Sequence, residues 1–464
     1  MKTAIINLKS LDKIFSNTKQ KSTSYDFNSL LTLLASFAIM IGAAYLVYVF
    51  HDDLLKFNSE NLNTSLGSIF FSLLGGLFAF KAVTFIYDLF LYFKYKPIAS
   101  VSDEELPTVT VIVPAYNEGK QVWETLKSLS NSDYPKEKIQ ILSIDDGSKD
   151  DTWEWMQEAK RLLGKHVTIM QQPKNMGKRH ALYRGFHTGT GEVFVTVDSD
   201  SIVKKDTLRN LVSPIVTDEN CGAVAGNIQV LNNKKALLPK MLNVSFVMSF
   251  EFKRSAESTL NSVLCTPGAL AAYRSTAIFA CLPEWIDQKF MGKASDIGED
   301  RALTNMILRQ GYSVLFQRNA YAYTNVPEDF QGLYKMFIRW DRSNVRENIA
   351  MAKYVFKNFK KENKFGTRLL FVTQTIEMIM AYPMIIFMLY FVAMHPILFV
   401  SSTLLSILVV SSFPVLFYAS RYELKEAFWA YSYSILFTFG LFWVTPYSIA
   451  TAGKSGWLTR ELKA

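Results

Sequence analysis

The sequence predicts an α/β domain with a mostly parallel sheet, inserted between transmembrane helices at the two ends of the chain. One observation behind this prediction is that apolar and charged residues are segregated, although the 464 residues are 49% hydrophobic and 20% charged overall. The other is that short apolar runs rich in β-branched residues alternate with helix-like stretches between residues 101 and 330, as in parallel sheets. The length suffices for one sizeable α/β domain and additional membrane material.

Five apolar segments flank this domain, and each is long enough to cross a bilayer. They are residues 30–50, 66–93, 369–391, 396–419 and 428–450. The second is interrupted by Lys81 and Asp88. The first is too long for the core of a signal peptide and no small-residue cleavage site follows it, so we expect a retained anchor.

Basic residues predict which side of the membrane the domain occupies. The first 26 residues contain five lysines, the loop after the first span contains Asp52, Asp53 and Glu60, and Lys94 and Lys96 follow the second span. By the positive-inside rule, the N-terminus and the domain face the cytoplasm. We therefore expect a multi-pass integral protein of the plasma (inner) membrane, with membrane lipids among its partners.

The C-terminal end poses a topological conflict. Two spans before the domain and three after it would place the C-terminus outside, whereas Lys454, Arg460 and Lys463 favour a tail on the inside. We therefore expect one late apolar segment to be re-entrant or interfacial. Glu377 lies inside the third apparent span, where it either lines a polar path or sits near the interface.

These observations divide the chain into six parts. They are a cytoplasmic N-terminal segment (1–28), two transmembrane helices (29–94), the cytoplasmic domain (101–330), an amphipathic interface segment (331–365), C-terminal transmembrane or interface helices (366–450) and a tail (451–464). The net charge of +9 suits an anionic inner leaflet and anionic substrates. Nucleic acid is not an expected partner, because there is no basic stripe, zinc-ligand spacing or aromatic RNA-binding signature. Three cysteines without Cys-x-x-Cys spacing predict no disulfide framework.

Acidic residues follow three of the predicted strands. Asn117-Glu118 comes after one apolar run, Asp145-Asp146 after the next, and Asp198-Ser-Asp200 after a third. Because the carboxyl ends of parallel strands meet at one edge of a sheet, we expect these side chains to converge there. The hard oxygens of the Asp-x-Asp pair can hold Mg²⁺ or Mn²⁺ against a diphosphate. The alternative is a solvated acidic face.

Four other segments have the chemistry of the same site, and each has a simpler alternative. Lys178 and Arg179 stand beside a glycine at a helix-like start, which suits a phosphate, although a basic helix start on the surface has the same pattern. An acid pair precedes the helix-like stretch after residue 300, where it is either functional or a helix cap. Residues 265–268 form a turn that lines a pocket or is merely a loop. Arg339-Trp340 either grips a sugar phosphate or anchors an amphipathic helix at the interface.

In combination these motifs resemble the processive family 2 glycosyltransferases. Their order is Pro-Ala-Tyr-Asn-Glu, Asp-Asp-Gly-Ser, Asn-x-Gly-Lys-Arg-His, Asp-Ser-Asp, Gly-Glu-Asp-Arg and Arg-Trp. The sequence is most similar to the hyaluronan synthases and also resembles the chitin-oligosaccharide and poly-N-acetylglucosamine synthases. The similarity runs from about residue 108 to 347 and reappears at 456–460, Gly-Trp-Leu-Thr-Arg. It implies a nucleotide-binding α/β domain packed by amphipathic interface helices on a transmembrane channel.

The resemblance also implies roles for individual residues. On the nucleotide side, Tyr116 and Glu118 would meet the uridine, Asp145 would hydrogen-bond the base and Lys178 would lie near the nucleotide. Asp198 would reach the ribose or phosphate, Asp200 would ligate Mg²⁺ or Mn²⁺ and Arg339 would hold the diphosphate. Asp300 would be the general base, and Trp340 would stack on the acceptor sugar. Cys265, Thr266 and Gly268 would line the donor or acceptor pocket, and Glu299, Arg301, Trp457 and Arg460 would support the site.

These roles imply an inverting enzyme that polymerises UDP-sugars into an extracellular β-linked polysaccharide. One base and no enzyme nucleophile imply direct displacement at the anomeric carbon. The favoured product is hyaluronan, made from UDP-N-acetylglucosamine and UDP-glucuronic acid, and translocation of the polymer is expected. A chitin-like or poly-N-acetylglucosamine synthase, a uronan polymerase, a non-processive transferase to a lipid-linked acceptor and a catalytically silent scaffold are the alternatives. Met336 stands where the family usually has Gln, and residues 266–268 read Thr-Pro-Gly rather than Ser-Gly-Pro.

Overall fold

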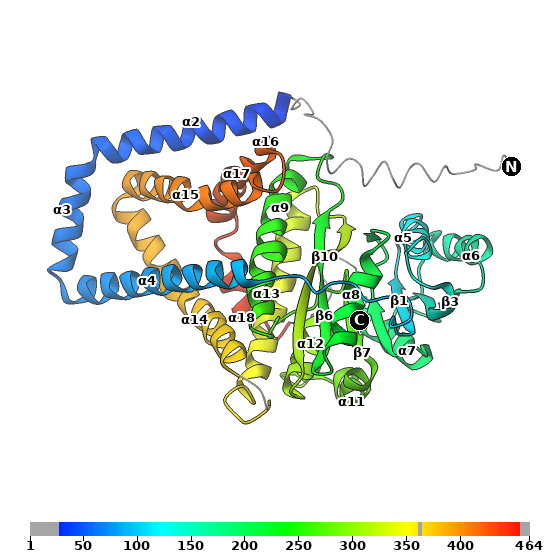
Figure 1. Cartoon of the computed structure of the whole chain (residues 1–464). Coiled ribbons are helices and arrows are strands. Elements are labelled where there is room, and N and C mark those ends of the chain that lie inside the picture. The colour runs from blue at the N-terminus through cyan, green and yellow to red at the C-terminus, as the bar shows by residue number, and fades with distance from the viewer. Residues whose placement is uncertain (1–26, 361–363, 455–464) are drawn as a thin grey trace.

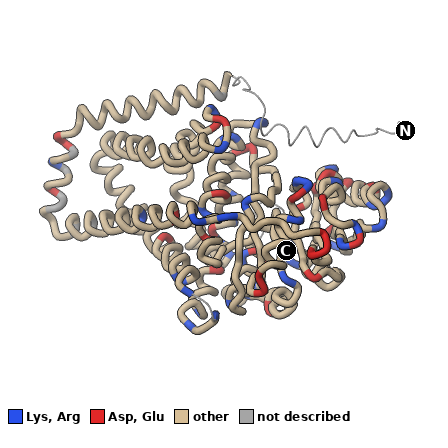
Figure 2. The backbone as a smooth tube through the Cα atoms, in the orientation of Figure 1, with Lys and Arg blue, Asp and Glu red and all other residues tan. Residues whose placement is uncertain are grey.

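The computed structural model describes residues 27–360 and 364–454 of the chain. Long helices from both ends of the chain lie on one side of the molecule and an α/β domain lies on the other (Figure 1). Figure 2 shows that charged residues gather on the domain, while the long helices are almost free of them. The segregation of residue types along the sequence is therefore also a segregation in space.

In the part of the chain that the structure describes, three helices precede the domain. They are α2 (Phe27–Val49), α3 (His51–Leu62) and α4 (Ser65–Lys94). Helix α2 packs along α15 (Pro396–Ala419), so it is joined to the later helices, and α4 packs against α10 (Arg254–Thr259), so it is joined to the domain. The helix α3 between them carries Asp52 and Asp53 in its first turn, where acids favour a helix N-terminus.

The domain is built on one eight-stranded sheet with the order β3-β2-β1-β4-β7-β6-β10-β5. The strands are β1 (Val109–Ala115), β2 (Ile139–Asp145), β3 (Val167–Gln171), β4 (Val193–Thr196), β5 (Ile202–Val203), β6 (Cys221–Val230), β7 (Ala271–Arg274) and β10 (Ser313–Thr324). Strands β3, β2, β1 and β4 run parallel, as do β6 and β10, whereas β7 is antiparallel to both its neighbours. A mostly parallel sheet was predicted, and it is confirmed.

Helices cover both faces of this sheet. They are α5 (Gln121–Ser130), α6 (Thr152–Leu163), α7 (Lys178–Thr188), α8 (Thr207–Thr217), α9 (Leu237–Phe246), α10, α11 (Ser275–Ile286) and α12 (Glu299–Arg309), with a π-helix η3 (Val247–Lys253), a short 3₁₀ turn η2 (Lys136–Lys138) and a small hairpin, β8 (Lys289–Phe290) and β9 (Lys293–Ala294). Val111 and Val113 of β1 belong to one core cluster, and Ile112 between them belongs to the cluster on the opposite face. This two-sided burial explains why the strand reads as a continuous apolar run.

Helix α13 (Phe330–Ala352) leads from the domain to the last group of helices, α14 (Phe365–Met394), α15, α16 (Leu424–Ala427), α17 (Trp429–Gly440) and α18 (Val444–Ala450). Among the described residues, four helices are long and apolar enough to cross a membrane: Leu30–Val49, Gly67–Lys94, Phe365–Met394 and Pro396–Ala419. The last apolar segment is not one straight helix but a pair bent by 48°, Leu424–Gly440 and Val444–Ala450. Counted as one span, this pair gives a fifth.

The bent pair brings the chain back to the domain. Helix α18 packs on α13, and the Arg346 guanidinium of α13 donates to the carbonyl oxygens of Ala452 (2.9 Å) and Lys454 (2.8 Å). Arg342, one turn earlier, donates to the hydroxyl of Thr451. The described chain therefore ends beside α13.

A close helix–strand contact gives a prediction on stability. A Cβ at Gly185 of α7 would lie 2.5 Å from Cγ2 of Ile112, a side chain buried in β1. We expect Gly185→Ala to cost about 1–3 kcal/mol, because a packed core cannot yield without strain. The measurement is thermal unfolding in detergent, where the variant should melt several degrees lower. Gly76→Ala in α4 is the matched control, since a Cβ there meets nothing within 4 Å; equal melting of the two variants would contradict the prediction.

Candidate active site

A single large cavity of about 1110 Å³ begins at the carboxyl edge of the sheet and extends along the helices that follow the domain. Its walls come from the ends of β1 and β4, the starts of α7 and α12, the α9–η3 segment and the helices α13, α14, α17 and α18. The predicted site residues that line it are Tyr116, Lys178, Asp198, Asp200, Cys265, Gly268, Glu299, Asp300, Arg301, Arg339 and Trp340. The structure thus brings together residues that are up to 224 positions apart in the chain.

Three predicted site residues do not line this cavity. Thr266 is fully buried, and its hydroxyl bonds to those of Tyr273 (3.0 Å) and Thr304 (2.7 Å), so it braces the turn instead of facing the pocket. That position corrects the expectation that Thr266 contacts a substrate. Asp145 is buried at the end of β2, where it accepts a bond from the Ser148 N–H, and the backbone N–H of Glu118 donates to the Thr152 hydroxyl. Trp457 and Arg460 lie outside the described residues.

Lys178 joins two acids at the narrow part of the cavity. Its Nζ lies 2.5 Å from Oδ1 of Asp198 and 3.1 Å from Oε1 of Glu299. Burial alone would lower the pKa of Lys178, but these carboxylates outweigh it and the pKa is raised. A Cβ at Gly268 would lie 2.6 Å from the same Nζ, so only glycine allows the lysine to reach this position. Lys178 begins α7, after Gly177 with a φ of +94°.

Asp200 presents a carboxylate to the cavity beside the Lys178–Asp198 pair. Its Oδ1 accepts a bond from the Thr324 hydroxyl (3.2 Å) at the end of β10. Among the described residues no group of three or more His, Cys, Asp or Glu is arranged to hold a metal ion. Mg²⁺ commonly binds through one or two carboxylates together with substrate phosphates, and hard oxygens of this kind are its preferred ligands. Asp200 therefore fits a divalent cation that arrives with a diphosphate.

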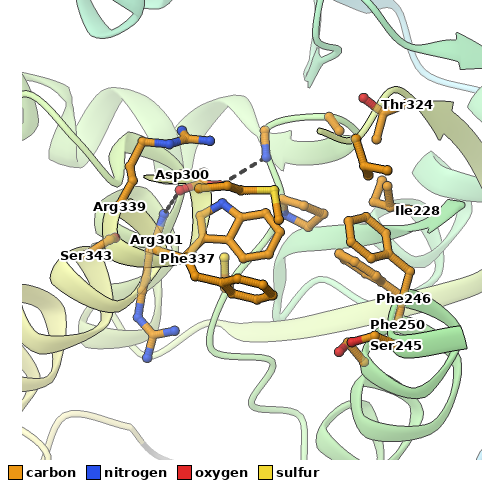
Figure 3. A pocket seen from close by; sticks show the side chains of 18 of the residues that line it. Ile228, Ser245, Phe246, Phe250, Asp300, Arg301, Thr324, Phe337, Arg339 and Ser343 are labelled. Carbon is orange, nitrogen blue, oxygen red and sulfur yellow. Dashed lines mark hydrogen bonds between the residues drawn. The ribbon is translucent and has the colours of Figure 1, made fainter. Parts of the chain in front are cut away.

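Asp300 lies in the first turn of α12, where backbone N–H groups hold both of its oxygens. Oδ1 accepts from the Arg301 N–H (2.7 Å) and Oδ2 from the Gly268 N–H (3.1 Å). Helix α12 starts after Gly298 in a left-handed conformation (φ +71°), and a Cβ there would collide with the Ser343 hydroxyl. Figure 3 shows Asp300 with Arg339 and Arg301 on either side of it.

The two adjacent acids of α12 have opposite pKa shifts. Burial and the neighbouring Glu299 carboxylate raise the pKa of Asp300 above its usual range, and Lys178 only partly counters them. Burial would also raise the pKa of Glu299, but Lys178 holds it below its usual range. A carboxylate with a raised pKa and a held orientation is suited to take a proton near neutral pH.

Asp146 was not among the predicted site residues, yet it lines the cavity. Its carboxylate accepts from the N–H groups of Met176 (2.9 Å) and Gly177 (2.8 Å), which immediately precede Lys178. Burial raises the pKa of Asp146. Asp146 therefore positions the loop that carries Lys178. The sequence signal was the Asp145-Asp146 doublet, which does not say which member faces the cavity.

Aromatic rings form the opposite wall. Trp340 meets Phe337 edge to face at 5.7 Å and Phe246 at 6.2 Å, and Phe246 meets Phe250 at 5.5 Å. Figure 3 shows Phe337 on one side of the pocket and Phe246 and Phe250 on the other. Met336, at the position where the resemblance predicts Gln, is buried and lines the cavity too. The pocket thus has a charged part and an aromatic part.

The sequence from residue 107 to 343 matches the family model described as "Glycosyltransferase like family 2". This chain belongs to the family 2 glycosyltransferases. The matched residues span the sheet, the carboxylate edge and the Arg339-Trp340 pair, so the family assignment covers the charged and aromatic sides of the cavity.

Curated relatives of this glycosyltransferase fall into two kinds. An N-acetylglucosaminyltransferase of Azorhizobium caulinodans is 30% identical over 320 residues, which cover 65% of this chain and 80% of the relative. A hyaluronan synthase of Streptococcus pyogenes is 30% identical over 289 residues, covering 61% and 68%. The matched segments cover between 58% and 80% of the length of such relatives.

A solved structure shares the fold. The mannosyltransferase PcManGT of Pyrobaculum calidifontis, in complex with GDP-Man and Mn²⁺, is 21% identical, with a TM-score of 0.50 over 81% of this chain and 96% of its own.

The pKa shifts of α12 give a prediction for the glycosyltransferase. If Asp300 takes the proton, activity falls as the pH drops through its raised pKa, because only the ionised carboxylate is a base. Glu299→Gln removes the like charge that helps to raise this pKa, so the acidic limb of kcat/KM should move to lower pH. The measurement is the pH profile of transfer from a UDP-sugar. Glu284→Gln, which changes an acid paired with Arg309 away from the cavity, should leave the limb in place; a limb that also stays in place in Glu299→Gln contradicts the assignment.

Proposed function

We propose that this enzyme is a membrane-embedded, metal-dependent transferase that extends a β-linked polysaccharide from UDP-sugars and remains attached to its product. The observation that carries the proposal is the single cavity in which Asp300, Asp198, Asp200, Lys178, Arg339 and Trp340 meet and which continues along α14 and α17. One end of the cavity has the charges that a nucleoside diphosphate needs. The other end leads to helices apolar enough to cross a membrane.

The diphosphate of the donor occupies the charged side in this proposal. Asp200, with Asp198 beside it, would hold Mg²⁺ or Mn²⁺, which supplies positive charge to the departing UDP. Lys178 and Arg339 supply further positive charge from the protein. Asp146 fixes the loop before Lys178, so the ammonium is positioned before the donor binds. Tyr116 lies at the end of β1 on the same wall, where it can contact the nucleoside.

The acceptor sugar occupies the aromatic side. Trp340 is partly exposed, and its ring gives the C–H face of a sugar an apolar surface. Asp300 then takes the proton from the attacking hydroxyl, which is a weak nucleophile unless a base removes its proton. This proposal needs no enzyme nucleophile and no covalent intermediate. The acceptor hydroxyl displaces UDP directly, so an α-linked donor gives a β-linked product. Cys265 and Gly268 line the same cavity, where they would contact the donor or the acceptor sugar.

Retention of the product is supported by the continuity of the cavity. Phe337 meets Phe437 of α17 at 5.8 Å, and Phe437 stacks with Tyr433 at 5.8 Å. These rings continue from Trp340 along the wall towards the apolar helices. A chain of sugar-binding rings holds a polymer between additions, whereas a transferase that adds one sugar to a lipid-linked acceptor does not need it.

The sugars are the least constrained part of the proposal. Hyaluronan synthases and N-acetylglucosaminyltransferases are equally similar in identity, so N-acetylglucosamine is the donor sugar that both kinds of relative support. Hyaluronan is favoured because an arginine, Arg301, lines the cavity next to Asp300 and suits a uronate carboxylate. Two other arginines have protein partners: Arg179 donates to the Trp285 carbonyl and Arg342 donates to the Thr451 hydroxyl. A homopolymer of N-acetylglucosamine is the second candidate.

The proposal includes the side of the membrane on which the catalytic domain lies. The apolar helices anchor the enzyme in the plasma (inner) membrane, with the catalytic domain in the cytoplasm where UDP-sugars are made. Lys94 at the end of α4 and Lys454 beside α13 lie on the domain side of the helices, which agrees with the positive-inside rule.

Two substitutions separate the base from the metal site. Asp300→Asn should keep UDP affinity within about twofold and lower sugar transfer by about 10³-fold or more, because a general base contributes about 10²–10⁴-fold. Asp200→Asn should instead weaken Mn²⁺-dependent donor binding. Calorimetry of UDP binding and radiolabelled transfer measure both effects. Asp103→Asn, on an exposed acid paired with Arg209, is the control. Near wild-type transfer by Asp300→Asn would refute its role as the base. Unchanged donor affinity in Asp200→Asn with Mn²⁺ present would refute its role as a metal ligand.

The donors consumed identify the product. Purified enzyme in detergent, without added lipid, should form long chains only when UDP-N-acetylglucosamine and UDP-glucuronic acid are both present, and hyaluronidase should degrade them. Long polymer from UDP-N-acetylglucosamine alone would establish the homopolymer instead. Addition of a single sugar to a supplied polyprenyl phosphate, with no polymer, would favour the lipid-acceptor transferase.

A further inference from the structure

One carboxylate in the aromatic part of the cavity lacks a charged partner. Asp341 follows Trp340 in α13 and lines the cavity. Its Oδ2 accepts a hydrogen bond from the Thr445 hydroxyl of α18 (2.8 Å), but among the described residues no cation lies within ion-pair distance of it. Four other acids of the cavity wall do have cationic partners: Asp198 and Glu299 pair with Lys178, Glu257 with Arg254 and Glu377 with Lys81.

The surroundings of Asp341 compensate its charge only in part. Burial raises the pKa of Asp341, and the Thr445 bond and the charge of Arg301, which lies beyond ion-pair distance, counter this incompletely. The Arg301 guanidinium itself donates to Gln374 (2.6 Å). A carboxylate accepts hydrogen bonds at both oxygens, and Oδ1 of Asp341 has no donor in the part of the chain that the structure describes. Asp341 can therefore accept hydrogen bonds from a ligand in the cavity.

A second polar group without a protein partner lies one turn further along α13. Asn344 is exposed and lines the cavity, and within residues 27–360 and 364–454 its side-chain amide has no hydrogen-bond partner. It follows Trp340 by four residues and Asp341 by three, and residues at these spacings are neighbours on a helix surface. The Trp340 ring and the two polar side chains therefore form one continuous surface of the cavity.

The other neighbour of Trp340 on this surface is apolar. Met336 lies four residues before Trp340, is buried and lines the cavity too. A sugar that places its C–H face on the Trp340 ring carries its hydroxyl groups at its edge. These hydroxyl groups find no partner at Met336, but they find a carboxylate and an amide at Asp341 and Asn344. The polar edge of a stacked sugar is therefore directed towards those two side chains.

We propose that Asp341 and Asn344 bind the acceptor sugar that stacks on Trp340, and that the negative charge of Asp341 makes this place selective for a neutral sugar over a uronate. The inference rests on the proposed sugar transfer. The carboxylate accepts from hydroxyl groups and from an acetamide N–H, both of which N-acetylglucosamine supplies. The carboxylate of a uronate would instead meet a like charge in a partly buried place, which is unfavourable.

This selectivity is compatible with both candidate products. In an alternating polymer, a chain that ends in N-acetylglucosamine binds better than one that ends in glucuronate, so the two additions differ in acceptor affinity. A homopolymer of N-acetylglucosamine presents only the favourable chain end.

Two hyaluronan tetrasaccharides of equal composition and charge test the selectivity. One has N-acetylglucosamine at its non-reducing end and the other has glucuronate there. Their affinities for the purified full-length enzyme in detergent are measured by calorimetry with UDP and Mn²⁺ present, at about pH 8, well above the usual pKa of an Asp carboxyl. The variants are Asp341→Asn, Asp341→Ser, Asn344→Ala and the control Glu158→Gln, which changes a surface acid of α6 paired with Arg161.

We expect the wild-type enzyme to bind the tetrasaccharide that ends in N-acetylglucosamine at least about tenfold more tightly, because a like charge strongly disfavours the other chain end. Asp341→Asn and Asp341→Ser both remove the charge and should reduce this preference to about threefold or less. In Asp341→Asn the new amide oxygen can still accept from Thr445, so the packing of α13 on α18 is kept. Asn344→Ala should weaken the binding of both tetrasaccharides alike and keep their ratio, because Asn344 carries no charge. Glu158→Gln should bind both as the wild type does.

Equal affinities of the wild-type enzyme for the two tetrasaccharides would overturn the selectivity, as would binding of neither at millimolar concentration. A preference that persists in both Asp341 variants would also overturn it, and so would one that Asn344→Ala abolishes as well. Failure of the proposed function gives a different result: a wild-type enzyme that transfers no sugar from UDP-N-acetylglucosamine or UDP-glucuronic acid would refute that function, whatever the two affinities are.

Discussion

The ammonium of Lys178 is the charge on which the arrangement of the active site depends. Asp198 ends a strand of the sheet, Glu299 starts α12 and Lys178 starts α7, so one cation joins three elements. Without it, buried carboxylates would face one another across the cavity, and each would become costly to ionise. The same cation lowers the pKa of Glu299 while the pKa of Asp300 stays raised. One lysine therefore fixes the geometry of the donor side and helps to separate the protonation states of two adjacent acids.

Most of the candidate site could be predicted, because the ends of the strands can be recognised in the sequence. Apolar runs of the right length identify parallel strands, and their carboxyl ends must meet, which brings the regions of Tyr116, Asp198 and Asp200 together. The side of the strand that a residue faces is harder to predict. Asp145 is the last residue of β2 and Asp146 follows it. Although they are neighbours in the sequence, the Asp145 side chain is buried in the core and Asp146 lines the cavity. Thr266 shows the same limit, because only the packed neighbours Tyr273 and Thr304 reveal which way its hydroxyl turns.

The course of the last apolar segment could be predicted only in part from the sequence. Its hydropathy is continuous, so composition alone predicts a span, and only the charges of the tail indicated a re-entrant or interfacial segment. The bend between α17 and α18 is a property of packing: α18 lies on α13, and Arg346 binds the carbonyl groups that follow it. The composition of α14 likewise signals a span, whereas only the structure shows that its Thr373 and Gln374 line the cavity.

The domain boundary drawn near residue 330 passes through the active site. Asp200 and Asp300 lie before it, but Arg339 and Trp340 belong to α13, and Gln374 of α14 holds Arg301. A fragment of residues 101–330 would keep the carboxylate edge with Phe246 and Phe250, and it would lose Phe337, Arg339 and Trp340. Catalysis and membrane attachment are therefore not separate functions of separate domains in this chain. Helices α14 and α17, which are apolar, line the same cavity as the carboxylates of the sheet edge.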